Sequence, residues 1–300
     1  HAEIAKYLKW EYANYGKIMF FALLWYGLSV FFSGHICDRI GGKKAMLVGL
    51  VGTIISNITF GSCYFLVRNG YTNPSVYFGL SLSELFTFMS VVWSINYIFQ
   101  SFGALSIVKI NSAWYKKHER GTFSGKFGSL IQVGRILVLV TCPWILKALP
   151  WPYVFYIPAF FQILVFAVVY MLVEESPHRS KGHGTIKDIW TVLATKENLR
   201  MVAFVAIFTG MIRNGVEHYI SRFFVDKFLP NNPRGLADFT PYIIYSILTP
   251  GMMILASLIS GPSSDKYFNS RRFPIMVAAY FLTIIGLTAL GFDMVNAYFS

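Results

Sequence analysis

Charged residues are scarce in this chain of 300 residues. Asp, Glu, Lys and Arg make up 13% of it, whereas a soluble domain carries about 25%. Hydrophobic residues make up 55%. These proportions exclude an ordinary soluble globular domain. They indicate a chain that lies in the lipid bilayer, where about 20 apolar residues are needed for a helix to span the hydrocarbon.

Cysteine is also rare, and the motifs of several enzyme classes are missing. The chain has 3 Cys residues, which lie far apart and lack the spacing of a metal site. The sequence contains no phosphate-cradling glycine loop with Lys and Ser or Thr, no His-Glu-x-x-His zinc motif and no nucleophile motif. We therefore expect no enzyme activity, no cofactor and no metal site.

Long apolar stretches occupy most of the chain. They predict eight membrane-spanning helices and hence an all-α integral membrane protein. Trp and Tyr gather near the ends of these stretches, as in the aromatic belts of membrane proteins. The predicted helices cover approximately residues 16–34, 45–67, 82–110, 121–146, 154–173, 199–224, 241–260 and 273–292.

The net charge of +12 is unevenly distributed between the predicted loops. One alternating set holds about twice as many Lys and Arg residues as the other, which is typical of cytoplasmic loops or loops on an equivalent side. This bias explains the positive charge without nucleic acid, so the expected partner is the lipid bilayer. The plasma membrane, a plastid membrane and the mitochondrial inner membrane all fit the pattern. The basic set comprises residues 35–44, 109–120, 174–200 and 261–272.

One short motif occurs twice, each time in a predicted basic loop between two apolar stretches. Both copies begin with Gly, place Asp four residues later, follow it with a base and end in basic residues. The repetition predicts two related helical halves. The first copy consists of Gly34, Asp38, Arg39, Gly41, Lys43 and Lys44, and the second of Gly261, Asp265, Lys266, Arg271 and Arg272.

This motif resembles the loop that joins helices 2 and 3, and again helices 8 and 9, in the major facilitator superfamily. The resemblance implies a major facilitator-type helical bundle, with about eight membrane spans present out of an expected twelve. It divides the chain into an N-terminal half at 1–173, a cytoplasmic linker with an amphipathic helix at 174–198, and a C-terminal half at 199–300. The spans expected to be absent are the first and the last three.

Other segments resemble one branch of this superfamily, the organophosphate:phosphate antiporters. Phe99-Gln100, Glu119-Arg120-Gly121 and Glu175-Ser176-Pro177 carry this resemblance in the expected order. It implies that Arg213 binds a substrate phosphate and that Tyr26 lines the site. Four family positions differ, because a Lys, a His, a Trp and a Tyr are replaced by Val30, Ile131, Ala104 and Gly210, respectively.

Two arginines inside predicted helices are candidate anion-binding groups. A charge at the bilayer centre costs about 3 kcal/mol, and the planar guanidinium suits phosphate because it offers two parallel donors. We hypothesise that Arg135 and Arg213 face one anion. Alternatively, Arg213 pairs with Glu217 four residues later, and Arg135 pairs with an acid or caps backbone carbonyls. His218 is a candidate proton relay or a packing residue.

Asp38 and Asp265 have a predicted mechanical role. A carboxylate at such a helix junction can accept hydrogen bonds from helix-start amides and pair with a base on an adjoining helix. Making and breaking such contacts would bias which side of the protein is open. The alternative is a purely structural role in packing.

The predicted function is secondary transport of a small anion, either phosphate or a phosphorylated metabolite, by alternating access. Exchange against inorganic phosphate would supply the driving force. The competing hypothesis is a transport-inactive protein that serves as a structural or accessory subunit of a larger membrane complex, with other membrane protein subunits as partners. The altered family positions and the expected but absent spans favour this alternative.

Overall fold

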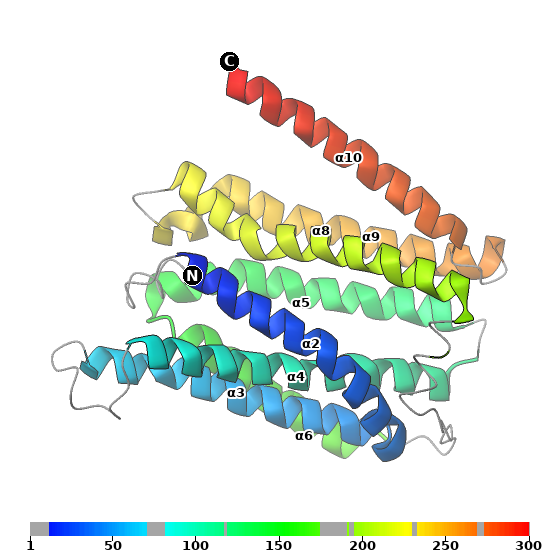
Figure 1. Ribbon diagram of the computed structural model, residues 1–300, viewed down its shortest axis with the longest axis horizontal. Coiled ribbons are helices and arrows are strands. Elements are labelled where there is room, and N and C mark those ends of the chain that lie inside the picture. The colour runs from blue at the N-terminus through cyan, green and yellow to red at the C-terminus, as the bar shows by residue number, and fades with distance from the viewer. Residues whose placement is uncertain are drawn as a thin grey trace. The chain divides into compact units, whose positions relative to one another are not determined.

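The structure is a computed structural model. It describes residues 12–70, 82–116, 119–174, 191, 195–229, 233–268 and 273–299. These ranges are mostly helical and contain no β-strand, which confirms the predicted all-α fold. In chain order the elements (Figure 1) are α2 (Tyr12–Ile40), α3 (Gly42–Gly70), α4 (Leu82–Trp114), α5 (Arg120–Ala148), α6 (Tyr153–Leu172), α8 (Glu197–Phe228), the 3-10 helix η1 (Pro233–Asp238), α9 (Thr240–Tyr267) and α10 (Phe273–Phe299).

Each of the eight predicted apolar stretches corresponds to one of the long helices, and most of these helices extend beyond the predicted bounds. Within the described part of the chain, six helices are long and apolar enough to cross a membrane, and α10 begins with a shorter apolar stretch, Phe273–Gly286. The six candidate spans are Asn14–Ile40, Gly42–Phe65, Glu84–Trp114, Gly121–Ala148, Tyr153–Leu172 and Thr240–Tyr267.

The predicted loop at residues 35–44 is wrong, because the chain reverses there through a single residue. Gly41 has a φ of 91°, a left-handed conformation that glycine adopts without a steric penalty. Its N–H donates to the Cys37 carbonyl at 3.0 Å, and its own carbonyl accepts from Ala45 N–H at 3.1 Å. This compact helix end places Asp38 on the last turn of α2 rather than in a loop.

The second copy of the motif is also more helical than predicted. Helix α9 continues through Pro262 to Tyr267, so Gly261, Asp265 and Lys266 lie on its final turns. Close packing against α5, described below, holds this segment as a helix although proline disfavours that state. Arg271 and Arg272 lie outside the described residues.

The chain divides into two compact units. Unit 1 comprises His1–Ala113 and Val138–Ser246, and unit 2 comprises Trp114–Leu137 and Ile247–Ser300. Both α5 and α9 are shared between the units. The predicted division into halves at residues 1–173 and 199–300 stays a prediction, and most of the amphipathic linker helix lies outside the described residues.

In unit 1, the largest cluster of buried side chains joins α3, α4 and the start of α6. Phe60 is central, since its ring lies 4.9 Å from the ring of Trp93 and 4.7 Å from that of Phe155. Because lipid is as apolar as these side chains, the cluster stabilises the fold through close packing rather than through exclusion of water. Its buried members are Phe60, Cys63, Tyr64, Leu85, Met89, Val92 and Trp151.

In unit 2, small residues let α5 and α9 approach closely. A Cβ atom added to Gly125 would lie 2.6 Å from the Ser257 carbonyl oxygen, and one added to Gly261 would lie 2.6 Å from the Gly121 carbonyl oxygen. Real Cβ atoms do not come this close to backbone. Contact between small residues is a common way for membrane helices to associate, and glycine is required at both positions.

A tyrosine compensates for a proline inside α5. Pro143 has no N–H, so the carbonyl four residues earlier, at Leu139, loses its helical donor. The hydroxyl of Tyr242, on α9, donates to this carbonyl at 3.3 Å and lies 3.2 Å from Ser221 Oγ of α8. Because the tyrosine proton is used on Leu139, Ser221 is the donor in the second bond. This contact joins three helices within unit 1.

Candidate functional site

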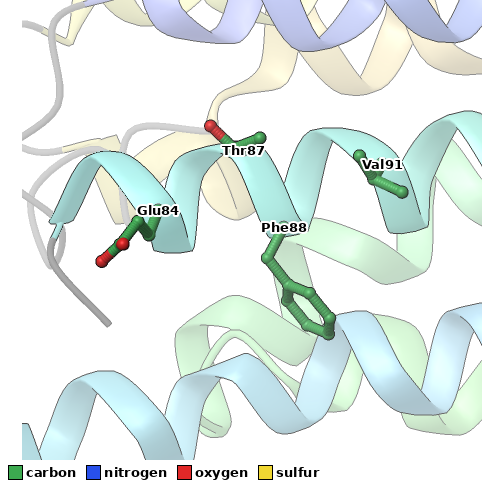
Figure 2. Close-up of a pocket in the computed structure, with 4 residues that line it drawn as sticks. All are labelled: Glu84, Thr87, Phe88 and Val91. Carbon is green, nitrogen blue, oxygen red and sulfur yellow. The ribbon is translucent and has the colours of Figure 1, made fainter. Parts of the chain in front are cut away.

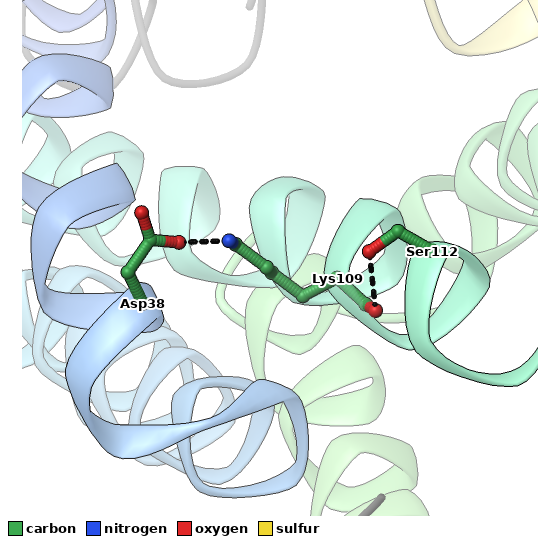
Figure 3. Close-up of polar contacts among 3 residues, drawn as sticks. All are labelled: Asp38, Lys109 and Ser112. Carbon is green, nitrogen blue, oxygen red and sulfur yellow. Dashed lines mark hydrogen bonds and ion pairs between the residues drawn. The ribbon is translucent and has the colours of Figure 1, made fainter. Parts of the chain in front are cut away.

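The first copy of the repeated motif is bound to another helix. Asp38, on the last turn of α2, forms an ion pair with Lys109 of α4 (Figure 3). The hydroxyl of Ser112 donates to the Lys109 carbonyl at 2.9 Å. The two charged side chains are 27% and 31% exposed, respectively, so the pair is only partly screened by solvent. The role of this contact in gating stays a prediction.

The second copy is bound to the start of α5. Asp265 Oδ2 accepts hydrogen bonds from the Thr122 backbone N–H at 2.9 Å and from the Thr122 hydroxyl at 3.3 Å. Thr122 lies in the first turn of α5, where backbone N–H groups lack helical partners and the helix dipole favours negative charge. The carboxylate therefore ties α9 to α5 within unit 2.

The remaining described bases of the motif differ in their surroundings. Lys43 Nζ donates to the Tyr170 carbonyl at 2.9 Å and lies 5.6 Å from the centre of the Tyr170 ring, so it joins α3 to α6. Arg39 and Lys44 are exposed. Lys266 is also exposed and lies over the ring of the neighbouring Tyr267.

Polar side chains of α2 and α4 lie near the middle of two candidate spans. Tyr26 of α2 is half-buried, and its ring contacts that of Tyr97 edge-on, with centroids 6.2 Å apart. Gln100 lies one turn further along α4 and is exposed. In the sequence, Gln100 contributed only to the family resemblance and was not named as a candidate site residue. The available signal was a second amide, Asn96, four residues earlier and therefore on the same face of a helix.

A row of buried or partly buried amides lies behind Gln100. Gln100 Nε2 donates to Asn96 Oδ1 at 2.6 Å, and Asn96 Nδ2 donates to Asn57 Oδ1 at 3.0 Å and to the Thr53 carbonyl at 3.4 Å. Asn57 Nδ2 then donates to Gln162 Oε1 at 3.2 Å. The row connects α4, α3 and α6. Asn96 itself is 1% exposed.

The predicted anion-binding arginines lie on two helices. Arg213 is in the middle part of α8, and its side chain and that of His218 lie outside what the structure describes. Glu217 on the same helix is half-buried. Arg135 is half-buried on α5, in the part that belongs to unit 2, whereas Arg213 belongs to unit 1. The hypothesis that both arginines face one anion stays a prediction.

A hollow of about 400 Å³ lies along the first turns of α4. It is lined by Glu84, Thr87, Phe88 and Val91, and Figure 2 shows the Phe88 ring extending away from the side of α4 that carries Thr87. Its single charged group is a carboxylate, which repels anions, so we do not assign it to an anionic substrate. Among the residues described here, no group of three or more His, Cys, Asp or Glu side chains is placed to hold a metal ion.

Comparison with known proteins identifies relatives that are named as phosphate-ester transporters and one that is named as a membrane sensor. The glycerol-3-phosphate transporter of Bacillus subtilis (strain 168) is 23% identical over 288 residues, which cover 87% of this chain and 59% of the relative. A probable hexose phosphate transport protein of Chlamydia pneumoniae is 24% identical over 292 residues, which cover 87% and 58%. The membrane sensor protein UhpC of Escherichia coli (strain K12) is 31% identical over 113 residues, which cover 38% and 21%.

The chain spans less than two thirds of the length of these relatives. Their names match the branch that the sequence resemblance indicated, which confirms that resemblance. The sequence profile of the Major Facilitator Superfamily matches residues 2–299, almost the whole chain. This chain therefore belongs to the major facilitator superfamily.

Proposed function

We propose that this chain is part of a secondary transporter that exchanges a phosphorylated metabolite for inorganic phosphate by alternating access. Its family and the names of its relatives support the substrate class. The observation that carries the mechanism is that both copies of the repeated motif use their Asp to bind the end of a second helix.

These contacts are weak enough to serve in a gate. An exposed ion pair contributes about 0–1 kcal/mol, and a carboxylate at a helix start contributes about 0.3–1 kcal/mol. A substrate shifts a conformational equilibrium only by the difference between its affinities for the two states, which amounts to a few kcal/mol. Contacts of this size can be broken and reformed during a transport cycle.

A similar contact lies on the side that the charge bias predicts to be non-cytoplasmic. Lys147, at the end of α5, bonds to Asp238 Oδ2, at the end of η1, at 2.6 Å. The two side chains are 46% and 54% exposed, so this pair is also easy to break. It ties α5 to η1, which fall in the predicted N-terminal and C-terminal halves, respectively, and its release would accompany opening on that side.

Substrate binding is assigned to polar groups near the middle of the spans. Arg213 would hold the phosphate, because guanidinium stays protonated and forms paired hydrogen bonds with phosphate oxygens. Tyr26 and Gln100 would contribute neutral hydrogen-bonding groups. A permanent charge at this depth is costly, so a visiting anion gives Arg213 a purpose that a purely structural role does not require.

The test is uptake of labelled inorganic phosphate by the native protein reconstituted in proteoliposomes. We expect Arg213→Ala to lower uptake by roughly 10-fold to 100-fold, the loss associated with a charge-assisted hydrogen bond. Arg200→Ala, which removes an exposed Arg from the first turn of the same helix, is the matched control and should retain uptake. Equal uptake by both variants would contradict the assignment of Arg213.

A second candidate function is that of a transport-inactive member of a larger membrane assembly. It is favoured by the relative named a membrane sensor protein rather than a transporter. In that case the reconstituted protein would bind glycerol 3-phosphate, but uptake would not exceed that of protein-free liposomes. Copurification with a defined set of membrane subunits would then identify the assembly.

A further inference from the structure

We propose that the amide row behind Gln100 orients this side chain so that it accepts hydrogen bonds from the hydroxyl groups of an organic phosphate. This inference rests on the proposed function and assigns a second part of the substrate. Arg213 would bind the phosphate, and Gln100 would select for hydroxyl groups on the carbon chain. Asn96, Asn57 and Gln162 are positioning residues that do not touch the substrate.

The direction of the row follows from one backbone carbonyl. A carbonyl oxygen only accepts hydrogen bonds, so the Asn96 atom that faces the Thr53 carbonyl at 3.4 Å must be the amide nitrogen. The same nitrogen donates to Asn57 Oδ1 at 3.0 Å. Asn96 therefore turns its oxygen toward Gln100, and Gln100 must offer its nitrogen, at 2.6 Å.

The remaining bonds run in the same direction. Asn57 accepts through its oxygen and donates through its nitrogen to Gln162 Oε1 at 3.2 Å. Each amide thus donates toward α6, and the amide dipoles align head to tail. Hydrogen bonds arranged in this way polarise one another in a low-dielectric interior. The oxygen-rich, negative end of the row lies at Gln100.

Gln100 therefore presents a defined set of groups at the exposed end. One of its N–H groups is used on Asn96, which leaves the second N–H and Oε1 with two lone pairs. The side chain is exposed, unlike Asn96 behind it, and lies one turn from Tyr97, which contacts Tyr26. The aligned row makes Oε1 a stronger acceptor, which favours hydroxyl donors and disfavours phosphate oxygens.

The experiment compares two esters that differ only in hydroxyl groups. Glycerol 3-phosphate and n-propyl phosphate have the same chain length and charge, and their apparent Kd values follow from the rise in melting temperature of the native protein with probe concentration. We expect wild type to prefer glycerol 3-phosphate by roughly 3-fold to 10-fold, the range for neutral hydrogen bonds. Equal affinities would overturn the inference and leave the proposed function standing.

Substitutions in the amide row test whether these residues orient Gln100 or only stabilise the fold. Asn96→Leu should abolish the preference while leaving the Kd for n-propyl phosphate within about 2-fold of wild type. Asn57→Leu should reduce the preference less, and Gln162→Met least, because these residues lie further from Gln100. If Asn96→Leu does not fold, the substrate preference of Asn57→Leu decides whether the inference stands.

The matched control is Ser62→Ala. Ser62 Oγ lies 3.1 Å from Tyr156 Oη across the same two helices, α3 and α6, but outside the row, and its loss should leave the preference unchanged. A parallel loss of affinity for both probes in the row variants, or an unchanged preference in Asn57→Leu and Asn96→Leu, would overturn the inference. If wild type binds neither probe, the proposed function fails and the inference fails with it.

Discussion

Two Asp–Lys pairs of this chain share the same chemistry and differ in exposure. Asp38–Lys109 is about one third exposed or less, and Lys147–Asp238 is about half exposed. Solvent screens the second pair more strongly, and median values for exposed pairs are about 0–1 kcal/mol. Removing one partner from a less exposed pair leaves a charge that water does not fully compensate. The two pairs therefore form a matched comparison.

Double-mutant cycles measure this difference. We expect a coupling energy of about 1 kcal/mol for Asp38→Asn with Lys109→Met, and about 0.3 kcal/mol for Asp238→Asn with Lys147→Met. Melting temperatures in detergent at low and high salt give both values, and salt should remove the second coupling first. A larger coupling in the more exposed pair would show that exposure does not set the strength of these contacts.

The close approach of α5 and α9 depends on helix surfaces that carry no side chain at the contact. Gly125 and Gly261 meet the partner backbone directly, whereas nothing in the structure lies within 4 Å of a Cβ atom added to Gly134 of α5 or Gly251 of α9. The same substitution is thus expected to have opposite effects at two pairs of positions on the same helices.

Alanine substitution tests this packing. Gly125→Ala and Gly261→Ala should each lower stability by about 1–3 kcal/mol, because the helices must separate or shift. Gly134→Ala and Gly251→Ala should be neutral or stabilising by up to about 1 kcal/mol, because alanine favours the helix. Thermal unfolding of the four variants is the measurement. Equal destabilisation at all four positions would contradict the close contact between α5 and α9.

The proline of α5 allows a second packing test, in which replacing Pro143 should reduce the effect of replacing Tyr242. Tyr242 is 3% exposed, and Tyr242→Phe leaves the partly buried Leu139 carbonyl without its donor, at a cost of about 1–3 kcal/mol. Pro143→Ala restores a backbone N–H to the same carbonyl. The cost of Tyr242→Phe should therefore fall in the Pro143→Ala background. An unchanged cost in thermal unfolding would show that the tyrosine acts through ring packing alone.

The helices themselves could be predicted from the sequence, because a long apolar run has few alternatives to a helix in lipid. Their ends could not. The loop at residues 35–44 shrinks to Gly41 because one left-handed glycine suffices to end α2, and α9 continues through Pro262 because packing on α5 outweighs local preference. Both outcomes depend on tertiary contacts that a local pattern does not contain.

The candidate site could likewise be predicted from the sequence only in part. Motif spacing singled out the repeated Asp residues and family resemblance singled out Tyr26, and the roles of these residues stay predictions. The hydrogen bonds behind Gln100 could not be predicted, because they involve Asn57, Asn96 and Gln162, which come from three helices and meet only in the folded chain. The assignments of Arg213 and Arg135 rest on their depth in predicted spans and stay predictions.

For the protein as a whole, family membership is established across residues 2–299, while the chain spans 59% of the Bacillus subtilis relative. The proposed transport activity combines a binding site near mid-membrane with weak contacts on both sides. Each contact is small enough for a substrate to overcome.

Exchange is the activity that the proposed function predicts. A protein that opens alternately to each side and binds both phosphate and its esters should move one against the other without ATP. A scaffold with the same architecture would bind without exchanging. Transport against a phosphate gradient therefore separates the two candidate functions more clearly than binding does.

The decisive measurement is uptake of labelled glycerol 3-phosphate by proteoliposomes that contain the native protein and are preloaded with inorganic phosphate. The account predicts faster uptake into phosphate-loaded vesicles than into unloaded ones, with the difference lost in Arg213→Ala. Uptake equal to that of protein-free liposomes, from a folded sample, would contradict it.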